Sequence, residues 1–195
     1  MQSDPLTEIL QRLLCQTEGP EVLLEAVANE EVIRSITEAD AAKVADCIGH
    51  SNGQPATIAA HILTLLVEKL AALRGNYNCR EAVMINRAIE KVFIAEDLQL
   101  QVAHCRLFNA HFCIAQDRFT DALHELDFVA NVFRTAGDHY ALACALLLRS
   151  ESRLRISGDR DLAVDELFEA ESLFKDHNDQ LRVQHCKELR HRYLA

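Results

Sequence analysis

One stretch of the chain decides the fold: residues 137–179 have the sequence GDHYALACALLLRSESRLRISGDRDLAVDELFEAESLFKDHND. Apolar residues recur at helical spacing over two runs, 139–156 and 160–175, and each run is bounded by Gly or Asn followed by Asp. Such pairs end one helix and begin the next. Because helices joined by a short loop pack antiparallel, this stretch predicts a helical hairpin.

The same pattern continues on both sides of this hairpin. It predicts further long helices over about 56–73, 79–95, 98–115, 119–135 and 179–194, and N-terminal ones over 5–15, 21–28, 31–36 and 41–48, most of them short. The chain has only 6 Gly and 3 Pro, too few for the many turns of a strand-rich fold. We therefore expect an all-α fold of stacked antiparallel helix hairpins, preceded by a segment of short helices.

The polar stretch 50–55, with Gly53 and Pro55, is the best candidate for a boundary. It separates an N-terminal helical segment, residues 1–50, from a helical-hairpin array over 56–195 that we expect to form one continuous unit with that segment packed on it. Residues 1–50 carry ten acidic side chains against three basic ones. Two interpretations stay open: an ordinary solvated surface, or an acidic face that steers toward a basic partner.

The second half of the chain repeats with a period of 41 residues. Asp97, Asp138 and Asp179 follow this spacing just before predicted helices, where an Asp side chain can cap free backbone N–H groups. Further columns in this frame are Ile85, Leu126 and Leu167; Ala88, Val129 and Ala170; Val92, Phe133 and Phe174; Ala122 and Ala163; and Leu107, Leu148 and Leu189. Several columns in one frame indicate a repeat array.

These residues resemble the tetratricopeptide family. Gly158-Asp159, followed by Ala163, Leu167 and Ala170, is similar to the second helix of that repeat, and the preceding unit has Phe119, Ala122, Leu126 and Val129, with Ala110 as the small residue of the first helix. The resemblance covers about residues 76–195 and is closest to the longer variants found in cell-polarity and signalling adaptors. Two departures are Glu151 at the small first-helix position and the lack of a Pro that closes each unit.

The resemblance implies a binding surface. In tetratricopeptide arrays the first helix of each unit lines a concave groove, and in this chain that lining would include His104, Leu107 and His111, then Leu148, Ser152 and Arg155. The Lys and Asn pairs with which chaperone-binding members hold a terminal carboxylate are missing. We therefore expect an apolar or mixed helical partner.

The last predicted helix is basic, with Arg182, Lys187, Arg190 and Arg192. One interpretation is a solvated helix with cations near its C-terminal end; the other is a docking helix for an acidic surface, with Arg182 and Arg190 as contacts. Leu189 and Tyr193 are expected to remain uncovered, which suggests a partner or self-association through this helix.

Composition argues against several other functions. The net charge of −10 disfavours nucleic acid as the main partner, and the longest apolar stretch, residues 62–67, is far too short to span a membrane. The 7 cysteines form no Cys-x-x-Cys pair and no signal peptide opens the chain, so we expect free, mostly buried thiols in a reducing intracellular compartment, cytoplasmic or nuclear.

No motif in the chain predicts catalysis. His104, Cys105, His111 and Cys113 are the densest set of metal-binding residue types, but two helical turns, about 10 Å, separate the histidines. Packed cysteines with groove-facing or surface histidines are the better interpretation. The isolated glycines build no phosphate loop and no Gly-x-Ser-x-Gly turn. We therefore expect no metal, no cofactor and no enzyme.

Two functions remain. The first is a non-catalytic scaffold, adaptor or structural subunit of a larger assembly that binds other proteins. The alternative is a regulatory sensor that binds a peptide or small ligand in the groove. Ligand-dependent stabilisation of a monomer would distinguish the sensor.

Overall fold

The structure is a computed structural model, and it describes residues 80–156 and 159–194 of the chain. By backbone contacts the chain divides into two compact units, Met1–Cys105 and Arg106–Ala195. The helices predicted before residue 79, the segment 1–50 and the boundary at 50–55 lie outside the described residues.

Six helices make up the described part of the chain: α6 (Arg80–Ala95), α7 (Gln99–Ala115), α8 (Phe119–Ala136), α9 (His139–Arg155), α10 (Arg160–Asp176) and α11 (Gln180–Leu194). Each of them begins and ends within one residue of its predicted bounds. No strand occurs among the residues described. The predicted all-α fold is therefore confirmed for this part of the chain.

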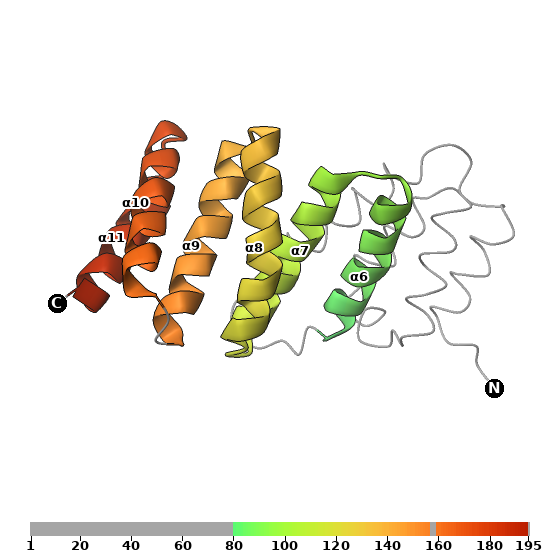
Figure 1. Cartoon of the computed structure of the whole chain (residues 1–195), viewed down its shortest axis with the longest axis horizontal. Helices are drawn as coiled ribbons and strands as arrows, with labels where there is room; N and C mark the ends of the chain where they lie inside the picture. The colour runs from blue at the N-terminus through green and yellow to red at the C-terminus, as the bar shows by residue number, and fades with distance from the viewer. Residues whose placement is uncertain (1–79, 157–158, 195) are drawn as a thin grey trace, which may run out of the picture. The chain divides into compact units, whose positions relative to one another are not determined.

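In the C-terminal unit the helices pack in chain order (Figure 1). α9 lies between α8 and α10, α10 packs against both α9 and α11, and α11 also reaches α9. Consecutive helices run antiparallel, as short loops require. Contacts restricted to neighbours give a repeat-like arrangement, in which α9 and α11 occupy one row and α8 and α10 the other.

The core of this unit follows the predicted columns. Small residues stand where two helices approach closely, and large ones fill the space between successive turns. The paired positions on α8 and α10 are all completely buried: Ala122 and Ala163, Leu126 and Leu167, Val129 and Ala170, and Phe133 and Phe174. The 41-residue spacing is therefore confirmed for these two helices.

Three turns between hairpins share one geometry. A residue one or two positions after the helix end has a positive φ in each: 55° at Asp97, 73° at Gly137 and 59° at Asn178. The next backbone N–H donates to the carbonyl oxygen of a buried Phe five residues earlier, over 2.9 Å to Phe93, 3.1 Å to Phe133 and 2.9 Å to Phe174. This Schellman arrangement satisfies carbonyl groups at each helix end.

The shared turn corrects two sequence predictions. Asp138 and Asp179 are helix caps, since their carboxylates accept from the N–H groups of Ala141 and Arg182 at 3.0 and 3.1 Å. Asp97 is not a cap, because it is the turn residue with left-handed backbone conformation. The residue directly before α7, where a cap would lie, is Leu98. Phe93, rather than Val92, is therefore the equivalent of Phe133, and the first interval is 40 residues.

The longer second interval has a simple origin. Three residues, 116–118, join α7 to α8, whereas four, 156–159, join α9 to α10. The small first-helix residue equivalent to Ala110 is therefore Ser150, which is completely buried, and the expected departure at Glu151 was wrong. For the same reason Phe108, rather than Leu107, matches the buried Leu148 and Leu189.

We predict that Gly137→Ala lowers the free energy of unfolding by about 1 kcal/mol, the order of the cost of a left-handed L residue. A Cβ at Gly137 meets no atom within 4 Å, so the cost is one of backbone conformation alone. Urea unfolding measures it. The control Asn178→Gly, at the equivalent turn, changes stability by less than about 0.5 kcal/mol, since relieved strain and added unfolded-state freedom oppose each other. Equal losses in both variants would contradict this account.

Candidate protein-interaction surface

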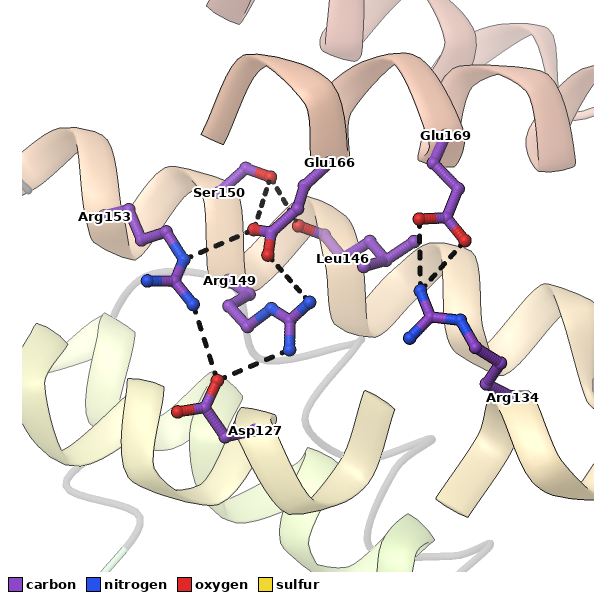
Figure 2. Close-up of polar contacts among 8 residues, drawn as sticks. All are labelled: Asp127, Arg134, Leu146, Arg149, Ser150, Arg153, Glu166 and Glu169. Atoms are coloured by element: carbon purple, nitrogen blue, oxygen red, sulfur yellow. Dashed lines mark hydrogen bonds and ion pairs between the residues drawn. The ribbon is translucent and has the colours of Figure 1, made fainter. Parts of the chain in front are cut away.

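A set of charged residues joins three helices of the C-terminal unit (Figure 2). Arg149 of α9 pairs with Glu166 of α10 at 2.7 Å and with Asp127 of α8 at 3.4 Å. Arg153, one helical turn later, reaches the same two carboxylates, each at 3.5 Å. Because α9 lies between α8 and α10, these contacts hold both neighbours to it. We call Asp127, Arg149, Arg153 and Glu166 the α9 bridge.

The inner half of the α9 bridge is buried. The Glu166 side chain is 5% exposed and that of Arg149 is 12% exposed, whereas that of Asp127 is 61% exposed. The hydroxyl of Ser150 is hydrogen-bonded to the Leu146 carbonyl oxygen at 2.7 Å and lies 3.3 Å from a Glu166 oxygen. Since a buried charge is tolerated only with a partner, Glu166 and its arginines depend on one another. They hold α8, α9 and α10 together.

We predict that Glu166→Ala destabilises the C-terminal unit by about 3–5 kcal/mol, because it leaves two largely buried guanidinium groups without their inner partner. Asp127→Ala removes the exposed acid of the same cluster and costs less than about 1 kcal/mol. Urea unfolding followed by circular dichroism compares the two. Similar losses in both variants would show that burial does not set the strength of this cluster.

Side-chain contacts also join the helices within each row. Arg134 of α8 donates to both carboxylate oxygens of Glu169 of α10, at 2.9 and 3.1 Å (Figure 2). In the other row, the Tyr140 hydroxyl of α9 donates to Asp179 at 3.0 Å, and Arg182 of α11 donates to both of these groups. Arg182, predicted as a partner contact, is therefore engaged within the chain.

The hydrogen bonds at Asp179 shift its titration. The backbone N–H of Arg182 does most to lower the pKa of the Asp179 carboxyl; burial opposes it, but the hydrogen bonds from the Arg182 and Tyr140 side chains lower the pKa further, so it lies below its usual range. The Tyr140 ring packs edge-on against Phe174 and His177, with ring centres 5.8 and 5.3 Å apart. Together these contacts fix the start of α11 against the start of α9.

We predict an acid-dependent contribution from Asp179. A pKa lowered by folding means stability that is present above the unfolded value of about 3.9 and lost as pH falls through the lower folded value. Asp179→Asn keeps a capping oxygen but removes the charge. The wild type should therefore exceed this variant in unfolding free energy at pH 7, and the difference should shrink by pH 3. A difference that stays constant between these pH values would contradict the role of the charge.

Arg190, another predicted partner contact, is also engaged within the chain. It pairs with Glu171 of α10, and its guanidinium lies 3.8 Å from the centre of the Phe168 ring. Burial raises the pKa of Glu171, but the hydrogen bond from Lys175 and the charge of Arg190 outweigh it, so the net pKa is lowered. Glu171 is thus a charged partner of α11.

The predicted groove residues divide into two groups. Leu148 and Ser152 are buried, and the Ser152 hydroxyl donates to the Leu148 carbonyl at 2.8 Å, so the prediction that they line an open surface was wrong. The cause is that α9 is covered by helices on both sides. Arg155 is exposed, 3.8 Å from Glu151. On α7, His111 is exposed, whereas His104 and Leu107 are half-buried.

The structure adds exposed residues that the sequence analysis missed. Tyr140 of α9 is 37% exposed and Leu181 of α11 is 77% exposed, at positions 41 residues apart in equivalent helices. The half-buried Cys144 and the exposed His185 follow one turn later on the same two helices. We call these four residues the α9–α11 face. The repeat spacing that paired the core columns would have paired Tyr140 with Leu181 as well.

The last helix differs from expectation. Leu189 is buried, so the prediction that it is offered to a partner was wrong, and Tyr193 is half-buried. Apart from Leu181, the exposed residues of α11 are polar: Gln180, Gln184, His185, Lys187, Glu188, His191 and Arg192. Because Leu189 is buried, it no longer suggests an apolar self-association through this helix.

The thiols described by the structure are free and largely buried. Cys105, Cys113 and Cys186 are buried and Cys144 is half-buried. Burial raises the pKa of the Cys144 and Cys186 thiols to about 11 and that of Cys105 still further. A thiol that stays protonated at neutral pH is a poor nucleophile. Among residues 80–156 and 159–194, no three His, Cys, Asp or Glu side chains are grouped as a metal site.

Comparison with known proteins identifies no relative. No protein-family model matches the chain, and neither a curated protein nor a solved structure shows significant similarity to it. Within the described residues, no helix is both long enough and apolar enough to cross a membrane.

Proposed function

We propose that this chain is a non-catalytic protein-interaction scaffold, an adaptor or structural subunit of a larger assembly, built on a long tetratricopeptide-like repeat. The observation that carries the proposal is the packing of the C-terminal unit. Each helix contacts its neighbours in the array, and an open row of equivalent positions exposes Tyr140 and Leu181. Arrays of this kind use the surface along the stack to bind proteins.

The chemistry of the α9–α11 face suits a protein partner. An aliphatic side chain as exposed as Leu181 loses contact with water when a partner covers it, which favours association. Tyr140 and Arg182, which contact each other, are of the residue types that contribute most to binding energy at interfaces. His185 of the same face is polar and exposed, as residues at the rim of an interface are.

The internal ion pairs support the same function. The α9 bridge and the Arg134–Glu169 pair use their charges between helices. The Tyr140–Asp179–Arg182 contacts likewise fix one helix start against another. A surface held in one conformation before binding loses less entropy when the partner arrives.

The test is purification of the tagged full-length chain from its native source, with quantitative mass spectrometry of co-purifying proteins. We expect at least one protein at near-stoichiometric yield, and at least about a tenfold loss of it in Leu181→Asp, since burying a new charge at the interface is costly. Leu162→Asp is the matched control, because Leu162 is an exposed leucine in the first turn of α10. It should retain the partner.

Circular dichroism must show the same helicity in both variants and in the wild type. Recovery of no stoichiometric protein with the wild type would refute the scaffold function. Equal retention by both variants would show that the partner does not bind the α9–α11 face.

A further inference from the structure

Two free thiols lie where α9 packs against α11: Cys144 of α9 is half-buried and Cys186 of α11 is completely buried. The two helices run in the same direction, because each is antiparallel to α10 (Figure 1). Arg182 of α11 lies over the Tyr140 ring of α9, 5.5 Å from its centre. Cys144 and Cys186 each follow these residues by four positions, about one helical turn. They therefore lie at the same level of two parallel helices.

The charges around Cys144 show which way its thiol faces. Burial raises the pKa of this thiol to about 11, and the next influences come from two groups at the start of α11: Arg182 lowers the pKa and Asp179 raises it. Burial is also the main cause of the raised pKa of Cys186, about 11, and Cys144 contributes to it. Cys144 therefore faces α11, within electrostatic reach of Cys186.

Packed helices can bring facing Cα atoms within the range of a disulfide. Helix axes pack about 8–10 Å apart, and the Cα atoms of each helix lie about 2.3 Å from its axis. A disulfide requires Cα atoms about 4.4–6.8 Å apart. Cysteines at one level of α9 and α11 can therefore be joined without a change of register between the helices.

We propose that Cys144 and Cys186 form a redox-sensitive cross-link between α9 and α11, with hydrogen peroxide as the oxidant. The Cys144 thiolate attacks a peroxide oxygen: an S–O bond forms, the O–O bond breaks, and the leaving hydroxide takes up the thiol proton as water. The Cys186 thiolate then attacks the Cys144 sulfur: the S–S bond forms, the S–O bond breaks, and the second hydroxide leaves as water with the Cys186 proton. Two thiols lose two electrons, which one peroxide gains.

Exposure sets the order of the two steps. Peroxide reaches Cys144 from solvent, whereas Cys186 is completely buried. Because both thiols stay protonated at neutral pH, the first step is slow and needs sustained peroxide. The second step is intramolecular, since the fold holds Cys186 beside the oxidised sulfur, and it therefore outpaces further oxidation of Cys144.

The cross-link attaches α11 to α9 covalently. It closes a loop of about 40 residues, which stabilises the folded chain by restricting the unfolded one. It also consumes the thiol of Cys144, a member of the α9–α11 face. Oxidation thus changes both the attachment of α11 and the surface beside it.

The experiment treats the full-length chain with hydrogen peroxide at about pH 8.5, where more thiol is ionised, then blocks the remaining thiols and digests without reductant. Trypsin places the two cysteines in separate peptides, residues 135–149 and 183–187, each with no other cysteine. Mass spectrometry should find these peptides joined at about 2 Da below their summed mass, and a reductant should separate them. Recovery of Cys144 as sulfinic or sulfonic acid, with no joined peptides, would overturn the proposal.

Controls show whether the fold places the thiols together. The same treatment in about 6 M guanidinium chloride should give at least about tenfold less of the joined pair, and an equal yield would overturn the proposal. Cys186→Ala should abolish the pair; alanine fits there because the equivalent residue on α9, Ala145, is completely buried. Cys113→Ala, which removes a buried thiol from α7, should leave the pair unchanged. Joined peptides found only in a dimer on a non-reducing gel would contradict a link within one chain.

The melting temperature tests the attachment of α11. The oxidised wild type should melt at least about 5 °C above the reduced protein, and Cys186→Ala should show no such rise. Joined peptides with an unchanged or lower melting temperature would overturn the stabilising attachment. The bond forms without a partner, so a co-purifying protein that depends on Leu181, together with no cross-link, refutes the cross-link and leaves the scaffold function standing.

Discussion

The arrangement of the C-terminal unit depends on how buried charge is compensated around α9. Glu166 is almost completely buried, and it pairs with two arginines of the neighbouring helix, Arg149 and Arg153. A slide of α10 along α9 by one turn would separate these groups inside a poorly solvated interface, which costs more than any surface contact could return. Apolar packing at Leu167 and Phe174 drives the helices together, but it is less selective about where they stop. The ion pairs therefore fix the register that the apolar core stabilises.

The helices themselves could be predicted because local signals agree with the packing. Gly137-Asp138 supplies a left-handed turn residue and then a cap, and the structure uses both. Leu126 and Leu167, 41 residues apart, are buried at equivalent positions of α8 and α10, as their spacing predicted. What the sequence could not reveal was the extra residue between Arg155 and Asp159, since one inserted residue leaves the pattern within each helix unchanged. It shifts the pairing between units by 100° around the helix axis, the angle between successive residues.

That shift explains why the site was predicted less well than the fold. Leu148 and Ser152 were assigned to an open groove, but a helix covered on both sides has few free positions, and these two face inward. A count of basic residues on α11 likewise cannot tell which are used internally. Arg182 and Arg190 contact Tyr140 and Glu171, whereas Lys187 and Arg192 face solvent. Which basic residues of α11 are paired depends on the residues that the neighbouring helices place opposite them, and those follow from the register between the helices.

Equivalent positions of the repeat have different surroundings on α9 and α11. On α9, Leu146 and Ser150 are apolar or small and are buried against a neighbouring helix, whereas their equivalents on α11, Lys187 and His191, are exposed. These polar side chains keep this side of α11 hydrated and disfavour apolar contact. An apolar surface that covered them would remove their hydration without offering a hydrogen-bond acceptor, which is costly. One repeat position can therefore serve packing on α9 and hydration on α11, because only the residue type at that position differs.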